Sequence, residues 1–157
     1  MGKKVLFLFL GLVLPILVFL FLKMFGKNQF DVPYPELKVP EDCLSPGAEP
    51  FIVADSTVAH FVNEPYELLV FNTGTTSAKL KKVTDNNRVK LVELAQGNAF
   101  YATHKMWLDR CVFLLSAPSS LIMLDSTRRI RGQYDGTDRD EIDRLEAEIK
   151  ILLKEYQ

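Results

Sequence analysis

Two cysteines carry the most reactive side chains of this sequence. Cys43 lies among prolines and Cys111 begins an apolar run, so the two thiols are too far apart in sequence to form a local redox motif. An even number of cysteines in a domain that faces an oxidising compartment allows one structural disulfide. Two free thiols, and a metal or redox role for the pair, stay open as alternatives.

Other side chains offer little further chemistry. His60 and His104 have no cysteine or carboxylate at ligand spacing, which favours surface or partly packed histidines over metal ligands. Ser119 and Ser120 have no identifiable base beside them and fit a strand end better than a nucleophile. We therefore expect no enzymatic activity, no catalytic residue, and no bound cofactor or metal.

The charge balance argues against one class of partner. The chain has a formal net charge of −1, and its short basic runs at 79–82 and 128–131 have acidic residues nearby. Such a distribution produces no field strong enough to gather nucleic acid. We expect a solvated surface and no nucleic-acid partner.

An apolar segment near the N-terminus predicts a membrane anchor. Val5–Leu22 contains no charge, and as a helix it would reach about 27 Å against a hydrocarbon core of about 30 Å. No small-x-small cleavage site follows, which favours a retained single-pass helix over a cleaved signal peptide. Lysines flank both ends, so charge alone leaves the orientation open.

The chain is expected to have three parts. Residues 1–27 form the anchor, residues 28–56 a proline-rich linker, and residues 57–157 one folded domain. The prolines between Pro33 and Pro50 oppose any regular helix or central strand in the linker.

The domain has the pattern of an α/β fold. Short apolar runs predict strands at 67–72, 88–95, 121–125 and 129–134. A helix is expected at 75–85, while 97–109 has no clear pattern. The clearest element is the last helix, in which Thr137 or Asp138 is the cap and five apolar residues share one face: Ile142, Leu145, Ile149, Leu152 and Leu153. This order predicts a thioredoxin-like sandwich with an N-terminal transmembrane helix.

One strand carries a specific motif. The fourth predicted strand and the turn after it contain Ile130, Arg131, Gly132, Tyr134, Asp135 and Gly136. With its flanking segments, from Leu121 to Leu153, this motif resembles the C-terminal third of the SCO/SenC family. These membrane-tethered thioredoxin-fold proteins help to assemble the copper centre of cytochrome oxidase. The sequence FDVPY at 30–34 is also similar to short bacterial members.

The resemblance implies a location and a site. It places the N-terminus on the inner side of the inner membrane and the domain on the outer side, in the periplasm. The family holds copper with a Cys-x-x-x-Cys loop and a histidine, but the matching segments 73–80 and 116–120 contain neither residue type. Arg128 also replaces the usual turn glycine, which strains the turn if φ is positive there.

The expected function follows from this resemblance and from the missing ligands. We expect a membrane-anchored SCO-like protein with a degenerate metal and redox site. It would act as a non-catalytic binding or assembly factor near respiratory cytochrome oxidase biogenesis, with an unidentified protein partner among the oxidase assembly components. Two alternatives stay open: a thiol-disulfide oxidoreductase using Cys43 and Cys111, and a structural subunit of a membrane complex.

Overall fold

The computed structural model describes residues 2–25, 31–43 and 51–154, and within the first helix the side chains of residue 9 and residues 11–21. The chain divides into two compact units, Met1–Phe30 and Asp31–Gln157. Parts of the predicted linker, residues 28–30 and 44–50, lie outside the described residues.

The N-terminal unit contains one helix, α1 (Lys3–Phe25), which includes Pro15. Across the described part of the chain, no helix is both long enough and apolar enough to cross a membrane. The predicted anchor at Val5–Leu22 is therefore wrong, and so is the inner-membrane localisation with a periplasmic domain that depended on it.

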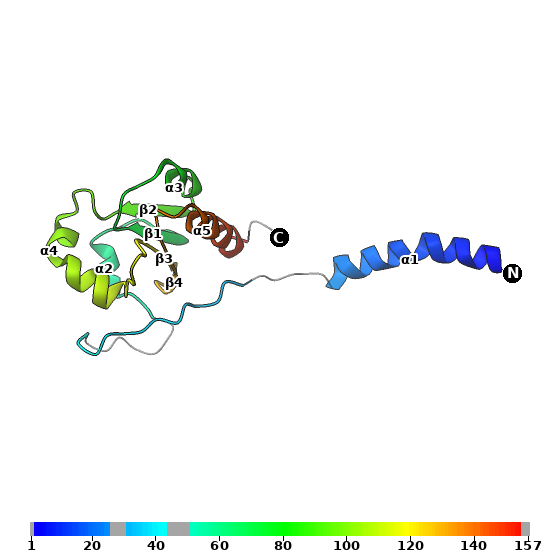
Figure 1. Ribbon diagram of the computed structural model, residues 1–157, viewed down its shortest axis with the longest axis horizontal. Helices are drawn as coiled ribbons and strands as arrows, with labels where there is room; N and C mark the ends of the chain where they lie inside the picture. The colour runs from blue at the N-terminus through cyan, green and yellow to red at the C-terminus, as the bar shows by residue number, and fades with distance from the viewer. Residues whose placement is uncertain (1, 26–30, 44–50, 155–157) are drawn as a thin grey trace. The chain divides into compact units, whose positions relative to one another are not determined.

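The second unit is an α/β fold built on a mixed sheet (Figure 1). Its four strands are β1 (Leu68–Asn72), β2 (Val89–Glu93), β3 (Leu121–Asp125) and β4 (Ile130–Tyr134). They lie in the order β2-β1-β3-β4, with β1 parallel to β2 and antiparallel to β3, and β4 antiparallel to β3. The four strands expected from the sequence are thus present. The predicted fold class is nevertheless wrong as stated, because it included a membrane-spanning helix, and α/β is the class that the structure shows.

Five shorter elements surround the sheet. They are α2 (Asp55–Ala59), α3 (Ala78–Val83), α4 (Ala99–Trp107), the π-helix η1 (Leu108–Val112) and α5 (Arg139–Leu152). Asp138 is the N-cap of α5 and accepts a hydrogen bond from the Asp140 N–H at 2.8 Å, as its residue type predicts. α4 and η1 occupy the segment in which the sequence had no clear pattern.

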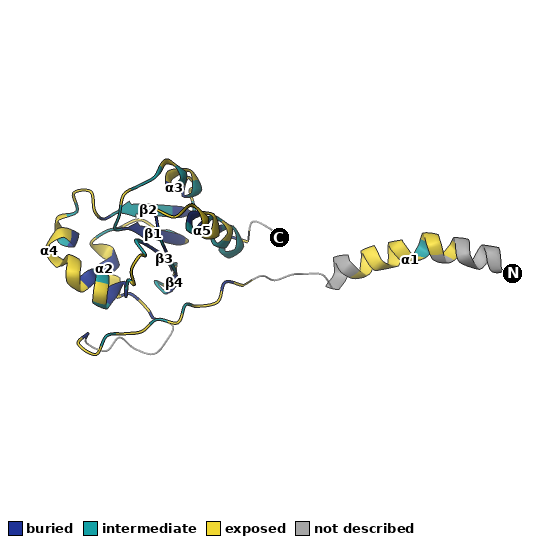
Figure 2. Ribbon diagram, in the orientation of Figure 1, coloured by how far each residue is buried: buried dark blue, intermediate teal, exposed yellow. Residues whose placement is uncertain are grey.

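The sheet separates two hydrophobic cores. Alternate side chains of β1 point to opposite faces, so Leu69 and Phe71 join one core while Leu68 and Val70 join the other. α2, α4 and η1 cover the first core, and α3 and α5 cover the second (Figure 1). All five residues of β1 are buried, because both faces of this inner strand are covered (Figure 2).

Candidate functional site

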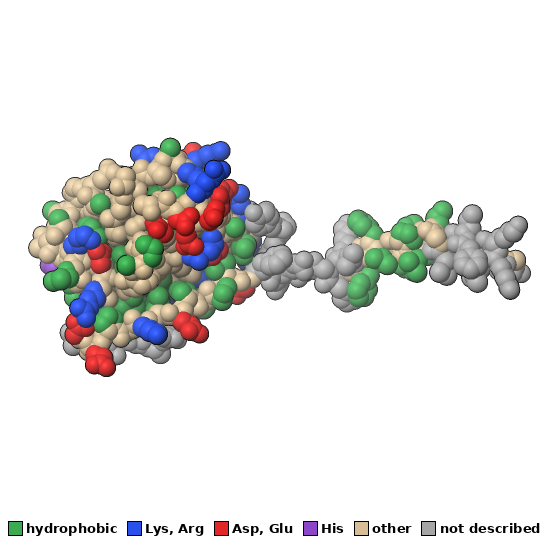
Figure 3. All heavy atoms as spheres, viewed as in Figure 1, with side chains coloured by type: hydrophobic (Ala, Val, Ile, Leu, Met, Phe, Trp, Pro, Cys, Tyr) green, Lys and Arg blue, Asp and Glu red, His purple; other side chains and the backbone are tan. Residues whose placement is uncertain are grey.

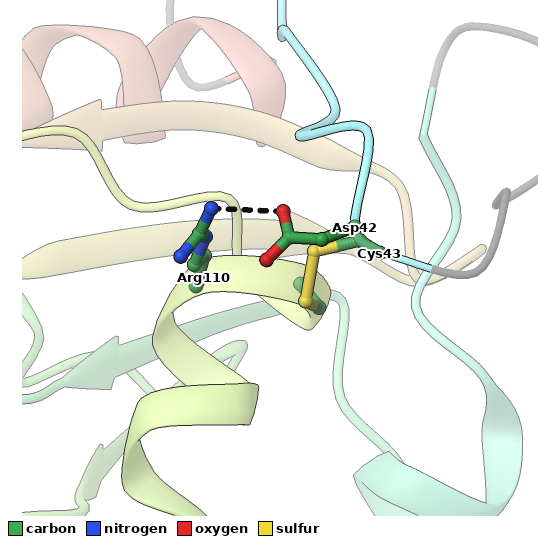
Figure 4. Close-up of a disulfide and its surroundings, with 4 residues drawn as sticks. Asp42, Cys43 and Arg110 are labelled. Atoms are coloured by element: carbon green, nitrogen blue, oxygen red, sulfur yellow. Dashed lines mark hydrogen bonds and ion pairs between the residues drawn. A yellow bond between two sulfur atoms is a disulfide. The ribbon is translucent and has the colours of Figure 1, made fainter.

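A disulfide joins the two cysteines of the sequence. Cys43 and Cys111 are bonded, with their Cα atoms 5.3 Å apart, so the predicted disulfide is confirmed (Figure 4). Cys43 is buried, whereas Cys111 lies in η1 and is half-buried. Beside the disulfide, Arg110 donates a hydrogen bond to Asp42 at 2.8 Å. The bond attaches residues 31–43, which we call the strap, to the irregular helix η1.

The other end of the strap is held by Arg131, a residue of the motif. Its side chain is 7% exposed and donates a hydrogen bond to the Val32 carbonyl at 2.7 Å. The guanidinium also lies 4.2 Å from the centroid of the Tyr34 ring, at cation–π distance. Residue 131 of the motif thus contacts residues 32 and 34, which belong to the described part of the FDVPY sequence at 30–34, although no sequence pattern predicted this contact.

A β-bulge explains why Arg131 reaches the strap. In the pairing of β3 with β4, Met123 faces Gly132 and Leu124 faces Ile130, which leaves Arg131 as the extra residue. A bulge turns the side chain of the extra residue away from its regular direction. The Arg131 Nε has no hydrogen-bond partner among the described residues although it is buried, so this clamp is incompletely satisfied.

A groove of about 480 Å³ lies between the strap and β4. Pro35, Leu37 and Lys38 of the strap line one side of it. Gly132 of β4 and Arg144 of α5 are among the residues that line the other. Lys38 is exposed and forms no ion pair with any residue that the structure describes, although Glu36 and Glu148 also line the groove.

The wall of the groove includes a strained residue. Leu114 has a φ of 52°, in the left-handed region that a bulky side chain rarely adopts, and it is buried. The Gln133 Nε2 donates hydrogen bonds to the Phe113 and Leu114 carbonyls, each at 2.9 Å, which holds this conformation. Strained backbone and π-helices occur often at functional sites. Both are present here, in Leu114 and η1.

Segments 73–80 and 116–120 lie against each other. The Thr73 N–H and Oγ1 both donate to the Ser120 carbonyl, at 2.9 and 3.0 Å. The buried Asn72 side chain accepts a hydrogen bond from the Gly74 N–H at 2.9 Å and donates one to Thr76 at 2.8 Å. These hydroxyl and amide groups are thus engaged in hydrogen bonds with neighbouring backbone and side-chain groups. Among the described residues, no group of three or more His, Cys, Asp or Glu side chains could hold a metal ion.

The other motif residues have structural roles. Gly132 is required because a Cβ at that position would overlap with the Tyr134 hydroxyl. That hydroxyl donates to Glu148 of α5 at 2.6 Å, and burial raises the Tyr134 pKa well above its usual range.

Asp135 accepts hydrogen bonds from Thr137 just before α5. Ile130 is fully buried, and the Gly136 N–H donates to Ser120. The motif therefore fastens β4 to its neighbours.

The two histidines lie against the same aromatic ring. His60 stacks on Phe100 with ring centroids 4.0 Å apart, and His104 lies 4.6 Å from the same ring. Both histidines are exposed. Their shared neighbour is a phenylalanine, which offers no ligand atom.

A polar cluster that the sequence did not reveal links α4 to η1. The buried Tyr101 donates to Asp109 at 2.8 Å, and Lys105 bonds to both residues. Burial raises the Tyr101 pKa, while the hydrogen bonds to Asp109 and Tyr101 raise the Lys105 pKa. At neutral pH the phenol is therefore neutral and the amine is charged, so neither group is an activated nucleophile.

The face in view in Figure 3 carries basic and acidic side chains next to one another. No protein-family model, curated protein or solved structure matches the chain. The site is therefore characterised by its own geometry: a groove with a strained wall, closed on one side by a strap that is fastened at both ends.

Proposed function

We propose that this chain is a non-catalytic, SCO-like binding protein that acts on a protein partner in the assembly of respiratory cytochrome oxidase. One observation carries the proposal. The two segments that match the family's ligand loops lie side by side, as copper binding would require, yet hydroxyl and amide groups occupy them. Such groups are poor ligands for a soft metal, which favours binding over metal chemistry.

The groove supports a binding role. Its volume of about 480 Å³ is within the range of about 300–1,000 Å³ that is typical of ligand sites. Its lining combines apolar surface, as in Leu37 and Leu115, with the charge of Lys38. The strained Leu114 is a second reason to place the contact here.

The absence of copper chemistry is tested by titration. The full chain is titrated with copper(I), once with the disulfide intact and once with both thiols reduced. We expect no stoichiometric binding of submicromolar affinity in either state, because the disulfide offers no thiolate and the two thiols of the reduced chain lack the further ligands of a complete site. Tight binding in either state would contradict the proposal.

Partner binding is tested by affinity capture of the full chain, followed by mass spectrometry of the proteins retained. Lys38→Glu reverses one charge of the groove, and Lys82→Glu makes the same change on the exposed side of α3. We expect an oxidase assembly component to be retained by the natural chain and by Lys82→Glu, and lost with Lys38→Glu. Equal retention by both variants would exclude the groove as the contact.

A further inference from the structure

We infer that the strap is a redox-controlled lid of the groove and that the Cys43–Cys111 disulfide is its latch. The inference rests on the proposed function, because it assigns the groove to the partner and adds how access is regulated. The two ends of the strap are held by different kinds of contact, and this difference carries the inference.

The N-terminal end of the strap is held firmly. Arg131 binds the Val32 carbonyl and stacks on Tyr34, and both the Arg131 and Val32 side chains are buried. This contact contains no sulfur, so a reductant leaves it unchanged. It can serve as the fixed end of a lid.

The middle of the strap has few attachments of its own. In the part of the chain that the structure describes, one backbone hydrogen bond lies within the strap, from the Cys43 N–H to the Pro40 carbonyl. Leu37 packs on the first core, while Glu36, Lys38 and Val39 are exposed. The position of this middle segment therefore depends on its two ends.

The C-terminal end depends on the disulfide. Among the described residues, the ion pair between Asp42 and Arg110 is the contact that remains beside it without the bond, and these side chains are 60% and 57% exposed. An exposed ion pair contributes little. Reduction therefore frees this end, the strap turns about the Arg131 clamp, and the groove wall around Leu114 opens.

The latch is opened by a protein or small-molecule dithiol. A thiolate of the reductant attacks the Cys111 sulfur, which belongs to the more exposed cysteine, and the Cys43 sulfur leaves as a thiolate that takes up a proton. The second thiolate of the reductant then attacks the mixed disulfide and releases Cys111. The chain gains two thiols, and the reductant becomes a disulfide.

Trypsin measures the opening directly, because Lys38 is the single basic residue of the strap. The full chain is digested in three forms: oxidised, reduced with dithiothreitol, and as the Cys43→Ser/Cys111→Ser variant. Cleavage at Lys82 on α3 is the internal reference. We expect cleavage after Lys38 to accelerate about tenfold or more in the second and third forms, because proteolysis follows local opening, with little change at Lys82.

Two results would overturn the latch. Equal cleavage at Lys38 in the oxidised and reduced forms would show that the strap stays in place. An equal acceleration at Lys82 would show that reduction loosens the whole domain.

Affinity capture then separates the latch from the function. Several-fold more partner on the reduced chain supports regulation, and equal amounts in the two states overturn it. No partner in either state overturns the proposed function and leaves the latch in place.

Discussion

The two faces of the sheet are covered in different ways. On one face, α5 packs with a regular stripe of buried residues, Ile142, Leu145 and Ile149, beside α3. The other face is covered by several short pieces, namely α2, a kinked α4, the π-helix η1 and the strap. The second face also contains the disulfide and the strained Leu114. Regular packing stabilises the first face, whereas the second depends on a cross-link and polar clamps, and the groove borders it.

The largest effect is expected on the regular face. Leu145→Ala should reduce the free energy of unfolding by about 3 kcal/mol, because the side chain is fully buried and α5 cannot collapse into the cavity. Leu152→Ala, on the same helix but only partly buried, is the control and should cost about 1 kcal/mol. Urea denaturation of both variants measures the difference. Similar losses would mean that α5 does not depend on its buried stripe.

The next effect concerns the contact between β4 and α5. Tyr134→Phe removes the hydrogen bond to Glu148 and should cost about 1.5 kcal/mol at pH 7. Burial raises the pKa of Tyr134, so the folded chain keeps the phenol neutral while the unfolded chain ionises it. The stability due to this shift is therefore complete below about pH 10 and is lost as the pH rises further.

Urea denaturation between about pH 7 and pH 11 measures this pH dependence. Tyr134→Phe should lose less stability than the natural chain over the alkaline part of that range. Tyr34→Phe is the control for loss of a tyrosine hydroxyl outside the core, because it keeps the ring that stacks on Arg131 and removes an exposed hydroxyl that accepts a hydrogen bond from Arg129. Parallel alkaline slopes for Tyr134→Phe and the natural chain would show that Tyr134 ionises equally in both states.

A smaller effect tests the dependence of the irregular face on its cross-link. Leu108 of η1 and Leu145 of α5 are both fully buried. The loss of unfolding free energy caused by Leu108→Ala should differ by about 1 kcal/mol between chains with and without the disulfide, because Leu108 and Cys111 belong to one short helix. The loss caused by Leu145→Ala should be the same in both chains. Double-mutant cycles with Cys43→Ser/Cys111→Ser measure both couplings. Equal coupling would remove the distinction between the faces.

The sequence predicted the regular face well, for a physical reason. Strands and amphipathic helices repeat their side-chain environment at fixed intervals, so β1, β3 and α5 were visible in the order of apolar residues. The cap at Asp138 was predictable for the same reason, because its side chain binds a backbone N–H only two residues further along the chain. The two cysteines were predicted to pair from their even number and from an expected oxidising compartment, and the structure joins them.

The irregular face and the groove were hidden for the opposite reason. A π-helix such as η1 has no characteristic repeat in sequence, and the groove is formed by segments that are far apart along the chain. One signal was missed: Asn98 caps α4 by accepting a hydrogen bond from the Tyr101 N–H. The predicted anchor at Val5–Leu22 failed because no helix among the described residues is both long enough and apolar enough to cross a membrane.

The smallest effect should be a gain in stability at the hairpin turn between β3 and β4. The sequence predicted strain if φ were positive at Arg128, and the observed φ is 66°. Glycine relieves a strain of about 1–2 kcal/mol, from which the greater freedom of the unfolded chain subtracts about 0.7 kcal/mol. Arg128→Gly also loses an exposed ion pair with Asp55 and removes a buried Nε that has no partner among the described residues.

The net result for Arg128→Gly should be a gain of about 0.5 kcal/mol in the free energy of unfolding. Arg128→Ala is the matched control, because it loses the same ion pair and keeps the strain, so it should give no gain. Leu114→Gly relieves the same kind of strain beside the groove, but it removes a buried side chain and should therefore destabilise the fold. Urea denaturation of the three variants distinguishes strain at an exposed turn from strain that packing enforces. An equal gain for Arg128→Gly and Arg128→Ala would assign the effect to the lost guanidinium instead of the backbone.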